Sequence, residues 1–512
     1  MSDTLKLNLY IGGDFVESAS GRRYQSINPA NGQPVVDCAW ADAADAQKAI
    51  AAAREAFDHG PWREYSGADR KALMLRVADL LKARQAEFVR YEVLDGGALI
   101  NKAKTDVALC IKQLRYFAEQ AEAYSAEMQP IEGAQKPGFS YLGTVREPLG
   151  VCAQIIPWNF PITMAIWKLG PALATGNTVV LKCAAETPVS ALELGKLFQE
   201  AGTPPGVVNI ITGEVEAGQA LAHSPKVDKI AFTGSTEVGR EILMATAGNF
   251  KRCTLECGGK SASIVLDDAD LEIAVDGALY GSFFHSGQVC ESGTRLLVDD
   301  KLHDRFVEAM VARVENMRIG DPMDPETTLG PVISQRQLDR ILDYVQIGQK
   351  EGARLATGGH RVTRDGLDAG FFVEPTIFTN VGNDMRIARE EIFGPVMSVI
   401  RHSGDQSAVD IANDSIYGLA AGVWSRDMDR ANALARKLHA GWVWLNEWHV
   451  LSEKAPFGGY KQSGIGRELG RECYEAYTQV KSIYQDDTSG RDAKFWYDVV
   501  FPRIEKSASS AE

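Results

Sequence analysis

Residues 150–174 read GVCAQIIPWNFPITMAIWKLGPALA and contain the unit from which the rest of the fold can be traced. The apolar run 150–156 has the length of a buried strand, and 162–174 has the length and apolar character of a buried helix. The segment between them, PWNFP, predicts a sharp turn from strand to helix. One β–α unit of a sheet is therefore expected here.

The same alternation of strand and helix continues to residue 257. Further strand-like runs lie at 178–181, 207–211, 229–232 and 253–255, and helix-like stretches lie at 188–201, 216–223 and 237–247. Strands that alternate with helices of this length predict a parallel, doubly wound sheet with right-handed crossovers. Such sheets bind ligands at the carboxyl ends of their strands, which is where PWNFP lies.

A second alternating series predicts a second α/β domain. Its strand-like runs lie at 263–266, 295–298, 397–400, 420–424 and 441–445, and its helix-like stretches at 271–284, 301–317, 334–349 and 428–438. Before residue 120 the chain is expected to be mostly helical, at 43–57, 68–84 and 102–124. Two segments, 125–148 and 476–489, fit neither domain, and the second alternates like an edge strand.

The composition limits the classes of partner. The chain has 512 residues, too many for one compact core, and its net charge of −14 argues against nucleic acid or an anionic membrane as a partner. Neither a signal peptide nor a membrane-spanning segment is expected from the apolar runs. Eight cysteines without a Cys-x-x-Cys pair suggest no metal site, and a reducing cytoplasm is the simplest setting.

Cys290 is the candidate nucleophile. It follows Gly-Gln-Val after an apolar, helix-like stretch, while Glu256 lies in TLECGGK and Asn159 lies in PWNFP. A thiol, a base and an oxyanion donor together make a covalent acyl-transfer site. Each residue alone also has a structural reading: a buried apolar cysteine, a glutamate paired with Lys260 or Arg252, and an asparagine helix cap.

These motifs, in this order and spacing, resemble the NAD(P)-dependent aldehyde dehydrogenase superfamily over about residues 5 to 490. Further matching segments are FTGSTEVG at 232–239, EEIFGP at 390–395 and PFGGYKQSG at 456–464. The resemblance implies a homodimer or homotetramer with an α/β, aldehyde dehydrogenase-like fold. Its implied parts are a Rossmann-type cofactor domain (1–124 and 149–257), a second α/β catalytic domain (258–475), a small β oligomerisation arm (125–148 and 476–489) and a C-terminal tail (490–512).

The resemblance also implies oxidation of an aldehyde to a carboxylic acid through a thiohemiacetal and a thioester on Cys290. Asn159 and the Cys290 backbone N–H would stabilise the alkoxide, and Glu256 would activate the water that releases the acid. His285, where the family often has Asn, is expected to be packed or exposed.

Three other functions are open alternatives to this one. Glu256 argues against a CoA-acylating aldehyde dehydrogenase, in which CoA would release the acyl group. The intact Cys290, Asn159 and Glu256 argue against a non-catalytic structural protein on the same fold. A cofactor-free thiol hydrolase would leave the cofactor motifs without a purpose.

The expected cofactor is NAD or NADP. No Gly-x-Gly-x-x-Gly motif is found, but a Gly- and Ser-rich turn at 234–239 lies between a strand and a helix and suits a pyrophosphate. By resemblance, Lys182 would bind the adenosine ribose and Glu391 the nicotinamide ribose. Ala185 lies where many NAD-specific members carry Glu, so NADP is expected to be tolerated. The expected cofactor residues are Ile155, Pro157, Trp158, Lys182, Ala185, Gly234, Ser235, Gly258, Glu391 and Phe393.

The expected substrate is an apolar or aromatic aldehyde. Trp167 lies where semialdehyde-specific relatives tend to have Arg, and aromatic side chains suit apolar aldehydes. The residues expected to line the substrate tunnel are Phe160, Met164, Trp167, Val289, Glu291, Leu451 and Phe457. Glu291, Trp448 and His449 depart from an all-apolar lining, so a cationic or polar aldehyde stays open.

Overall fold

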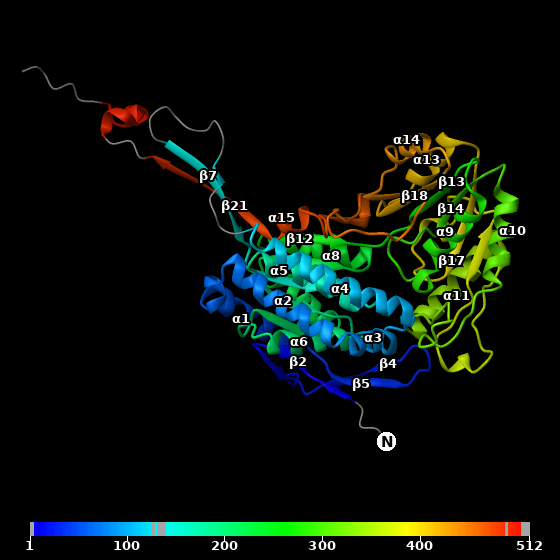
Figure 1. Cartoon of the computed structure of the whole chain (residues 1–512), viewed down its shortest axis with the longest axis horizontal. Coiled ribbons are helices and arrows are strands. Elements are labelled where there is room, and N and C mark those ends of the chain that lie inside the picture. The colour runs from blue at the N-terminus through cyan, green and yellow to red at the C-terminus, as the bar shows by residue number, and fades with distance from the viewer. Residues whose placement is uncertain (1–4, 125–128, 131–139, 487–489, 503–512) are drawn as a thin grey trace, which may run out of the picture.

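The computed structural model describes residues 5–124, 129–130, 140–486 and 490–502, and its largest sheet has eight strands (Figure 1). These strands are β2 (Leu9–Ile11), β3 (Asp14–Val16), β8 (Val151–Ile155), β9 (Thr178–Lys182), β10 (Val208–Ile211), β11 (Lys229–Thr233), β12 (Arg252–Glu256) and β20 (Gly464–Ile465). Their order across the sheet is β20-β12-β11-β8-β9-β10-β2-β3. The strands β8 to β12 run parallel and match the five strands expected between residues 150 and 257.

The order of the parallel strands reverses between β8 and β11. From β8, the strands β9 and β10 follow to one side, and β11 and β12 lie on the other. Loops from two adjacent strands part at such a reversal, and this leaves a crevice at their carboxyl ends. The loop after β8 carries PWNFP and the loop after β11 carries Gly234 and Ser235, so both expected ligand loops meet at this point.

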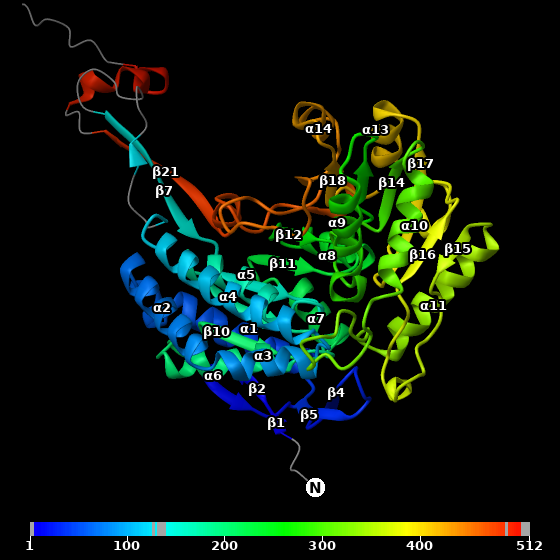
Figure 2. The ribbon, with the colours of Figure 1, turned by 45° about the vertical axis from the view of Figure 1, so that its right-hand side comes forward.

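Helices cover both faces of this sheet (Figure 2). Alternate residues of the strands pack on α1 (Ala43–Asp58) and α7 (Val215–His223) on one face, and on α5 (Pro161–Ala174) and α6 (Val189–Glu200) on the other. Further out, α2 (Gly67–Ala83), α3 (Gln85–Leu94) and α4 (Ile100–Gln120) pack on α5 and α6. α8 (Thr236–Thr246) follows β11, and the Ser235 hydroxyl caps its first turn by accepting from the Val238 N–H.

A second sheet of seven strands confirms the predicted second α/β unit. Its order is β15-β16-β17-β14-β13-β18-β19. The strands are β13 (Ala262–Val265), β14 (Arg295–Asp299), β15 (Arg354–Thr357), β16 (Thr376–Thr379), β17 (Val396–His402), β18 (Ala420–Trp424) and β19 (Trp442–Leu445). One face packs on α9 (Leu271–Phe283) and α10 (His303–Val314), and the other on α11 (Gln335–Lys350), α13 (Asp405–Asn413) and α14 (Met428–Ala435). The strands β15 and β16, the helix α13 and the short α12 (Arg386–Arg389) were not predicted.

The mostly helical start is confirmed, since α1, α2 and α4 match the three expected helices, but the structure adds short strands before them. β1 (Leu5–Leu7), β4 (Arg23–Ile27) and β5 (Pro34–Ala39) form a three-stranded sheet, while β2 and β3 extend the large one. These strands are three to six residues long, too short to give a periodic pattern that sequence inspection detects. None of the described helices is both long and apolar enough to cross a membrane.

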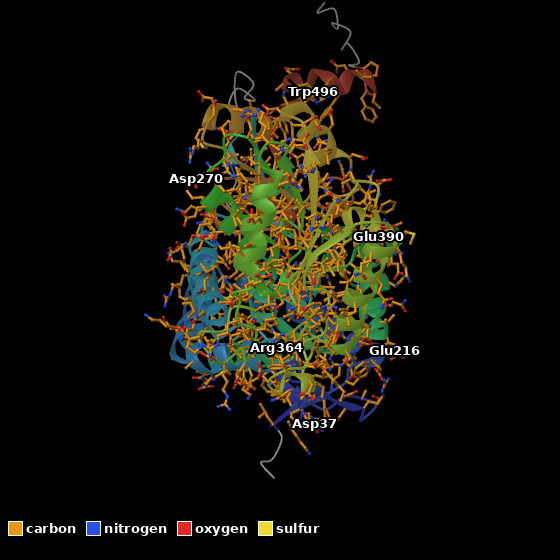
Figure 3. The ribbon with its side chains drawn as sticks, turned by 90° about the vertical axis from the view of Figure 1, so that its right-hand side faces the viewer. Asp37, Glu216, Asp270, Arg364, Glu390 and Trp496 are labelled. Atoms are coloured by element: carbon orange, nitrogen blue, oxygen red, sulfur yellow. The ribbon has the colours of Figure 1, made fainter. Side chains whose placement is uncertain are left out.

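An arm projects from the body in both ribbon views (Figures 1 and 2), and it holds the three-stranded sheet β21-β7-β6. β21 (Thr478–Asp486) pairs antiparallel with β7 (Ser140–Pro148) along its whole length, and the two-residue β6 (Gln129–Pro130) pairs with β7. α15 (Glu472–Ala476) leads into β21, and the 3₁₀ helix η5 (Arg491–Val499) follows it. Trp496 on η5 and Asp37 on β5 lie at opposite ends of the molecule (Figure 3). Parts of the expected arm and tail, 125–128, 131–139, 487–489 and 503–512, lie outside the described residues.

Candidate active site

One cavity of about 830 Å³ is lined by segments attached to both large sheets. Cys290, Glu256 and Asn159 all line it, so the structure brings together three residues that lie far apart in the sequence. Asn159 follows β8, Glu256 ends β12, and Cys290 precedes β14. Within the described residues, no group of three or more His, Cys, Asp or Glu side chains could hold a metal ion.

Cys290 is presented by a tight loop after α9. His285, Ser286 and Gly287 have positive φ angles of 50°, 54° and 71°. Position 287 requires glycine, because a Cβ there would lie 2.2 Å from the Gly394 carbonyl oxygen. The loop leaves Cys290 half-buried at the cavity, whereas all the other cysteines except Cys253 are fully buried.

His285 is packed, which is one of the two expected outcomes, and its ring makes no hydrogen bond with the Cys290 thiol among the described residues. Its ring centroid lies 5.7 Å from that of Phe160, and the side chain is buried. Burial lowers the pKa of His285 well below its usual value, with the nearby Lys102 charge acting in the same direction. Burial therefore favours the neutral imidazole, which packs behind Phe160 and lies outside the cavity lining.

Asn159 is anchored on the loop that carries the nucleophile. Its side-chain amide donates to the Gln288 carbonyl oxygen over 2.8 Å. The Gln288 side chain is fully buried; it accepts from the Ile333 N–H at 2.9 Å and donates to the His285 carbonyl at 3.2 Å. An amide carries two N–H groups, so one can fix the orientation of Asn159 while the other serves an oxygen in the cavity. Gln288 was missed as a positioning residue; its only sign in the sequence was its place in GQVC.

Glu256 is a buried carboxylate without a hydrogen-bond partner among the described residues. Burial raises the pKa of Glu256 well above its usual value, the nearby Glu468 charge adds to this, and Lys168 and Arg467 oppose it. A Cβ at Gly458 would lie 2.7 Å from Glu256 Oε1, so glycine keeps space open beside the carboxylate. The ion pairs with Lys260 or Arg252 that the structural reading required are not formed in the described part of the chain.

Behind Glu256 lies a buried ion pair that the sequence did not reveal. The Lys168 ammonium donates to Glu468 at 2.6 Å and to the Thr233 hydroxyl at 2.8 Å. Lys168 lies on α5, and its carbonyl oxygen accepts from the Gln154 side chain at 2.7 Å. Both Glu256 and Glu468 line the cavity, so this pair sets the charge around the candidate base.

The far end of the cavity begins at the first turn of α8. Seven expected cofactor residues line this end: Pro157, Trp158, Gly234, Ser235, Gly258, Glu391 and Phe393. The Glu391 carboxylate accepts from the Gly259 N–H at 3.0 Å, and burial raises the pKa of Glu391 to about 7. The Phe393 ring stands edge-on to Trp158 at a centroid distance of 5.2 Å, and Gln337 donates to the Phe393 carbonyl at 2.8 Å.

The near end of the cavity has aromatic walls. Six expected tunnel residues line it: Phe160, Met164, Trp167, Glu291, Leu451 and Phe457. Val289, also expected there, is buried and lies outside the lining because its side chain packs into the protein interior. His449 lines it as expected, whereas Trp448 is fully buried and lies outside the lining. The structure adds Asp106, Gln113, Tyr280, Phe284 and Glu453 to the lining.

The carboxylates at this near end are all paired. Asp106 binds the Lys102 ammonium at 2.5 Å, Glu453 lies 3.0 Å from that of Lys112, and Glu291 accepts from His449. Trp167 donates its indole N–H to Gln113 at 2.9 Å and packs on Phe457 at a ring distance of 5.6 Å. The tunnel is therefore aromatic, with polar groups that already have partners.

A model of the aldehyde dehydrogenase family matches residues 15–483. The chain belongs to the aldehyde dehydrogenase family. It is 47% identical over 478 residues to the putative aldehyde dehydrogenase DhaS of Bacillus subtilis, covering 93% of this chain and 95% of that protein. It is 43% identical over 481 residues to the betaine aldehyde dehydrogenase of the same species, covering 93% and 97%. The NAD+ complex of an aldehyde dehydrogenase from Bacillus cereus matches with a TM-score of 0.91 and 42% identity, covering 94% and 97%.

Family membership confirms the predicted family, fold and enzyme class of this aldehyde dehydrogenase. Three expected cofactor residues, Ile155, Lys182 and Ala185, lie outside the cavity lining. Ile155 and Lys182 both lie close to Gly218 of α7, where an added Cβ would come within 3.9 Å of each side chain. The Lys182 ammonium donates to the Cys183 carbonyl at 3.1 Å, and burial lowers its pKa. The roles assigned to all these residues stay predictions.

Proposed function

We propose that this NAD(P)-dependent aldehyde dehydrogenase oxidises an apolar or aromatic aldehyde to the carboxylic acid through a thiohemiacetal and a thioester on Cys290. One observation carries the proposal. A half-buried thiol, an anchored side-chain amide and a buried carboxylate that has no partner among the described residues line a single cavity, whose other end opens at the first turn of α8. These are the groups that covalent acyl transfer with hydride loss requires.

In the first half-reaction, Cys290 Sγ attacks the aldehyde carbon and the carbonyl oxygen becomes an alkoxide. The second N–H of Asn159 and the backbone N–H of Cys290 donate to that oxygen. One such donor typically contributes about 3 kcal/mol to the transition state. The bond from Asn159 to the Gln288 carbonyl holds this donor in place before substrate arrives, so no reorientation is needed during the reaction.

The residues at the far end suit a nicotinamide dinucleotide. The N–H groups at the start of α8 and the Ser235 hydroxyl would hold its pyrophosphate, and Glu391 would hold a ribose, with Phe393 beside it. The Glu391 carboxylate is fixed on one side by the Gly259 N–H, which leaves its second oxygen to accept hydroxyl groups. When bound, the cofactor accepts the hydride lost as the alkoxide collapses to the thioester.

In the second half-reaction, Glu256 removes a proton from the water that hydrolyses the thioester. A carboxylate with an ordinary pKa is a weak base, but burial raises the pKa of Glu256 and strengthens it. Lys168 limits that rise, because its positive charge favours the ionised form. Neither buried carboxylate oxygen has a hydrogen-bond partner among the described residues, so either can accept a hydrogen bond from a water that enters the site.

The substrate assignment rests on the near end of the cavity. Trp167 and Phe457 form an aromatic wall, and Phe160 and Leu451 continue it. The carboxylates there have partners, which disfavours a site built to bind a free cation. The betaine aldehyde dehydrogenase relative makes a cationic aldehyde the alternative to be tested.

We also propose the domain division given above, with the arm as an oligomer contact. β21 is an edge strand, and Val480 and Ile483 on it are exposed in the described chain. An exposed edge with apolar side chains favours pairing with another copy, which fits a homodimer or homotetramer. The eight free cysteines fit a reducing compartment such as the cytoplasm.

The deciding experiment measures NAD(P)H formation with hexanal, benzaldehyde and betaine aldehyde, each with NAD and with NADP. Free acid must form without CoA. Preference for hexanal or benzaldehyde supports the substrate assignment, and preference for betaine aldehyde overturns it. Failure to form acid unless CoA is added would assign the enzyme to the CoA-acylating class.

A further inference from the structure

The carboxylate of Glu291 touches the candidate nucleophile directly. The Cys290 thiol donates to Glu291 Oε2 over 3.2 Å. The other oxygen, Oε1, accepts from His449 Nδ1 at 3.2 Å. The side chains of Glu291 and His449 are only 8% and 5% exposed, so this chain of thiol, carboxylate and imidazole is screened from bulk water.

The loop before His449 holds Glu291 from two sides. The fully buried Trp448 donates its indole N–H to the Glu291 carbonyl oxygen at 3.2 Å, while His449 binds the carboxylate. His449 adopts a left-handed backbone conformation with φ of 61°, which a non-glycine residue adopts only when its surroundings impose it. Its ring packs against Tyr280 and Phe284 at 5.2 and 5.0 Å. The loop is therefore built to aim the imidazole at Glu291.

We propose that Glu291 is the base that accepts the Cys290 thiol proton, and that His449 is a positioning residue that keeps Glu291 an ionised acceptor. The inference rests on the proposed function, since it concerns the same nucleophile. Neither Glu256 nor His285 is proposed to accept the thiol proton. Glu256 is the proposed base for the hydrolytic water, and His285 packs against Phe160.

The proton and electron transfers balance within the two half-reactions. As a sulfur electron pair forms the C–S bond, the thiol proton moves to Glu291 Oε2 and the carbonyl π pair moves to oxygen. Because its pKa is low, Glu291 then passes the proton on to water and is ionised again while the thioester exists. When water, deprotonated by Glu256, displaces the sulfur, the C–S pair returns to sulfur and the thiolate takes up a proton from water through Glu291. Glu291 thus serves the thiol, and Glu256 serves the water.

The charges around the thiol agree with this resting arrangement. Burial raises the pKa of Cys290 well above its usual value, and Glu291, Glu391 and Glu256 all add to the rise. Burial alone would raise the pKa of Glu291, but the hydrogen bond and charge of His449 lower it overall. On the far side of Glu291, Tyr280 faces the charges of Glu447 and Asp106 as well. The proton therefore rests on sulfur, beside an ionised acceptor.

Glu291→Gln tests the assignment by two readouts that should move in opposite directions. In stopped flow with benzaldehyde and saturating cofactor, the first-turnover rate of NAD(P)H formation should fall about a hundredfold or more, the usual effect of losing a general base. Without cofactor, alkylation of Cys290 by iodoacetamide at pH 7 should become faster, because the charge that keeps the proton on sulfur is gone. A merely structural role would slow both reactions.

Glu447→Gln is the matched control. Glu447 precedes the same Trp448–His449 pair, is exposed and lies outside the cavity lining, so the same chemical change should leave both rates unaltered. Glu291→Ala adds a second test, because sodium formate could restore part of the first-turnover rate, whereas sodium chloride at the same ionic strength could not. His449→Phe should move the acidic limb of the first-turnover pH profile to higher pH, because Glu291 would lose the hydrogen-bond donor that lowers its pKa.

The possible results distinguish a failure of this inference from a failure of the proposed function on which it rests. A wild-type enzyme that forms no NAD(P)H with any aldehyde would remove the proposed function. A wild-type enzyme that turns over normally, with Glu291→Gln equally fast in the first turnover, would overturn the role of Glu291 alone. The role of Glu291 would also be overturned by a second result: Glu291→Gln slows both alkylation and the first turnover, and formate does not raise the first-turnover rate of Glu291→Ala. Thermal unfolding and cofactor binding confirm that each variant is folded.

Discussion

The Glu391 carboxylate lies directly against Gly258, where an added Cβ would come within 2.2 Å of the nearer carboxylate oxygen. The next residue, Gly259, donates its backbone N–H to the same carboxylate at 3.0 Å. The two glycines after Glu256 thus connect the end of β12 with the segment that carries Glu391 and Phe393. A substitution at Gly258 should therefore weaken cofactor binding more than it slows the reaction at Cys290.

Gly258→Ala is expected to displace Glu391 and weaken cofactor binding by about tenfold or more. Overpacking of this kind typically costs about 1–3 kcal/mol. Binding of NADH and NADPH, followed by quenching of tryptophan fluorescence, measures the loss. Gly248→Ala is the control, because a Cβ at that exposed glycine meets nothing closer than 3.5 Å. Equal affinity for the cofactor in Gly258→Ala and wild type would show that Glu391 does not hold the ribose.

Much of the fold could be predicted because strands of parallel sheets are buried on both faces and read as continuous apolar runs. The run 150–156 became β8, and the runs that follow it became β9 to β12. The N-terminal strands could not be predicted in this way. β2 and β3 have three residues each, and they join the sheet through pairing with a distant strand, β10, which local pattern does not encode.

The site could be predicted only where a motif surrounds the residue. Cys290, Glu256 and Asn159 each lie in a recognisable segment, and all three line the cavity. Lys168 and Glu468 are single polar residues, 300 positions apart in sequence, and only the fold reveals their contact. The same holds for Glu291 and His449: the sequence marked both as unusual, but their hydrogen bond spans 158 positions.

Cys290→Ala should abolish the first turnover, because the only other thiol that the described residues bring to the cavity, that of Cys257, is buried. The only other described cysteine that is not fully buried is Cys253, so Cys253→Ala provides a matched control and should keep wild-type activity. Stopped-flow NAD(P)H formation and cofactor binding should be measured for both. First-turnover NAD(P)H formation by Cys290→Ala would assign the nucleophile elsewhere.

Glu256→Gln should complete one turnover and then stall, with steady-state turnover lowered about a hundredfold or more. The amide cannot remove a proton from water, while attack by Cys290 does not depend on it. Because burial raises the pKa of Glu256, its active, ionised form is lost as pH falls through that raised value. Wild-type thioester hydrolysis should therefore increase as the pH rises through that raised pKa, and residual hydrolysis in Glu256→Gln should not. Steady turnover by this variant would point to a different base.

Lys168→Met should destabilise the enzyme and shift the pH profile. Removing one partner of a buried ion pair typically costs about 3–5 kcal/mol, and here Glu468 would be left charged and buried. The loss of the Lys168 charge should also raise the pKa of Glu256 further, so thioester hydrolysis should require higher pH than in wild type. Urea unfolding and the pH dependence of steady-state turnover measure the two effects.

Two comparisons sharpen the prediction for Lys168. Lys71→Met makes the same change at an ion pair with Glu119 on the surface, where solvent screens the charges, and should destabilise the enzyme far less. The double variant Lys168→Met/Glu468→Gln removes both charges and should recover part of the stability lost by Lys168→Met. A double variant no more stable than the single one would mean that the uncompensated charge of Glu468 is not the source of the loss.

Cofactor choice should depend on the absence of a carboxylate at position 185. Ala185 is buried, Lys182 donates only to a backbone carbonyl in the described network, and the Glu186 carboxylate lies 3.5 Å from Arg336. Nothing at position 185 itself would repel a 2′-phosphate, so wild-type kcat/KM for NAD should exceed that for NADP by less than about a hundredfold, or ~3 kcal/mol.

Ala185→Glu should lower kcat/KM for NADP about tenfold more than for NAD, because like charges would then meet near Lys182. Ala185→Gln has the same size without the charge and should lower both values equally; a matching selective loss in this control would show that bulk, and not charge, decides the choice.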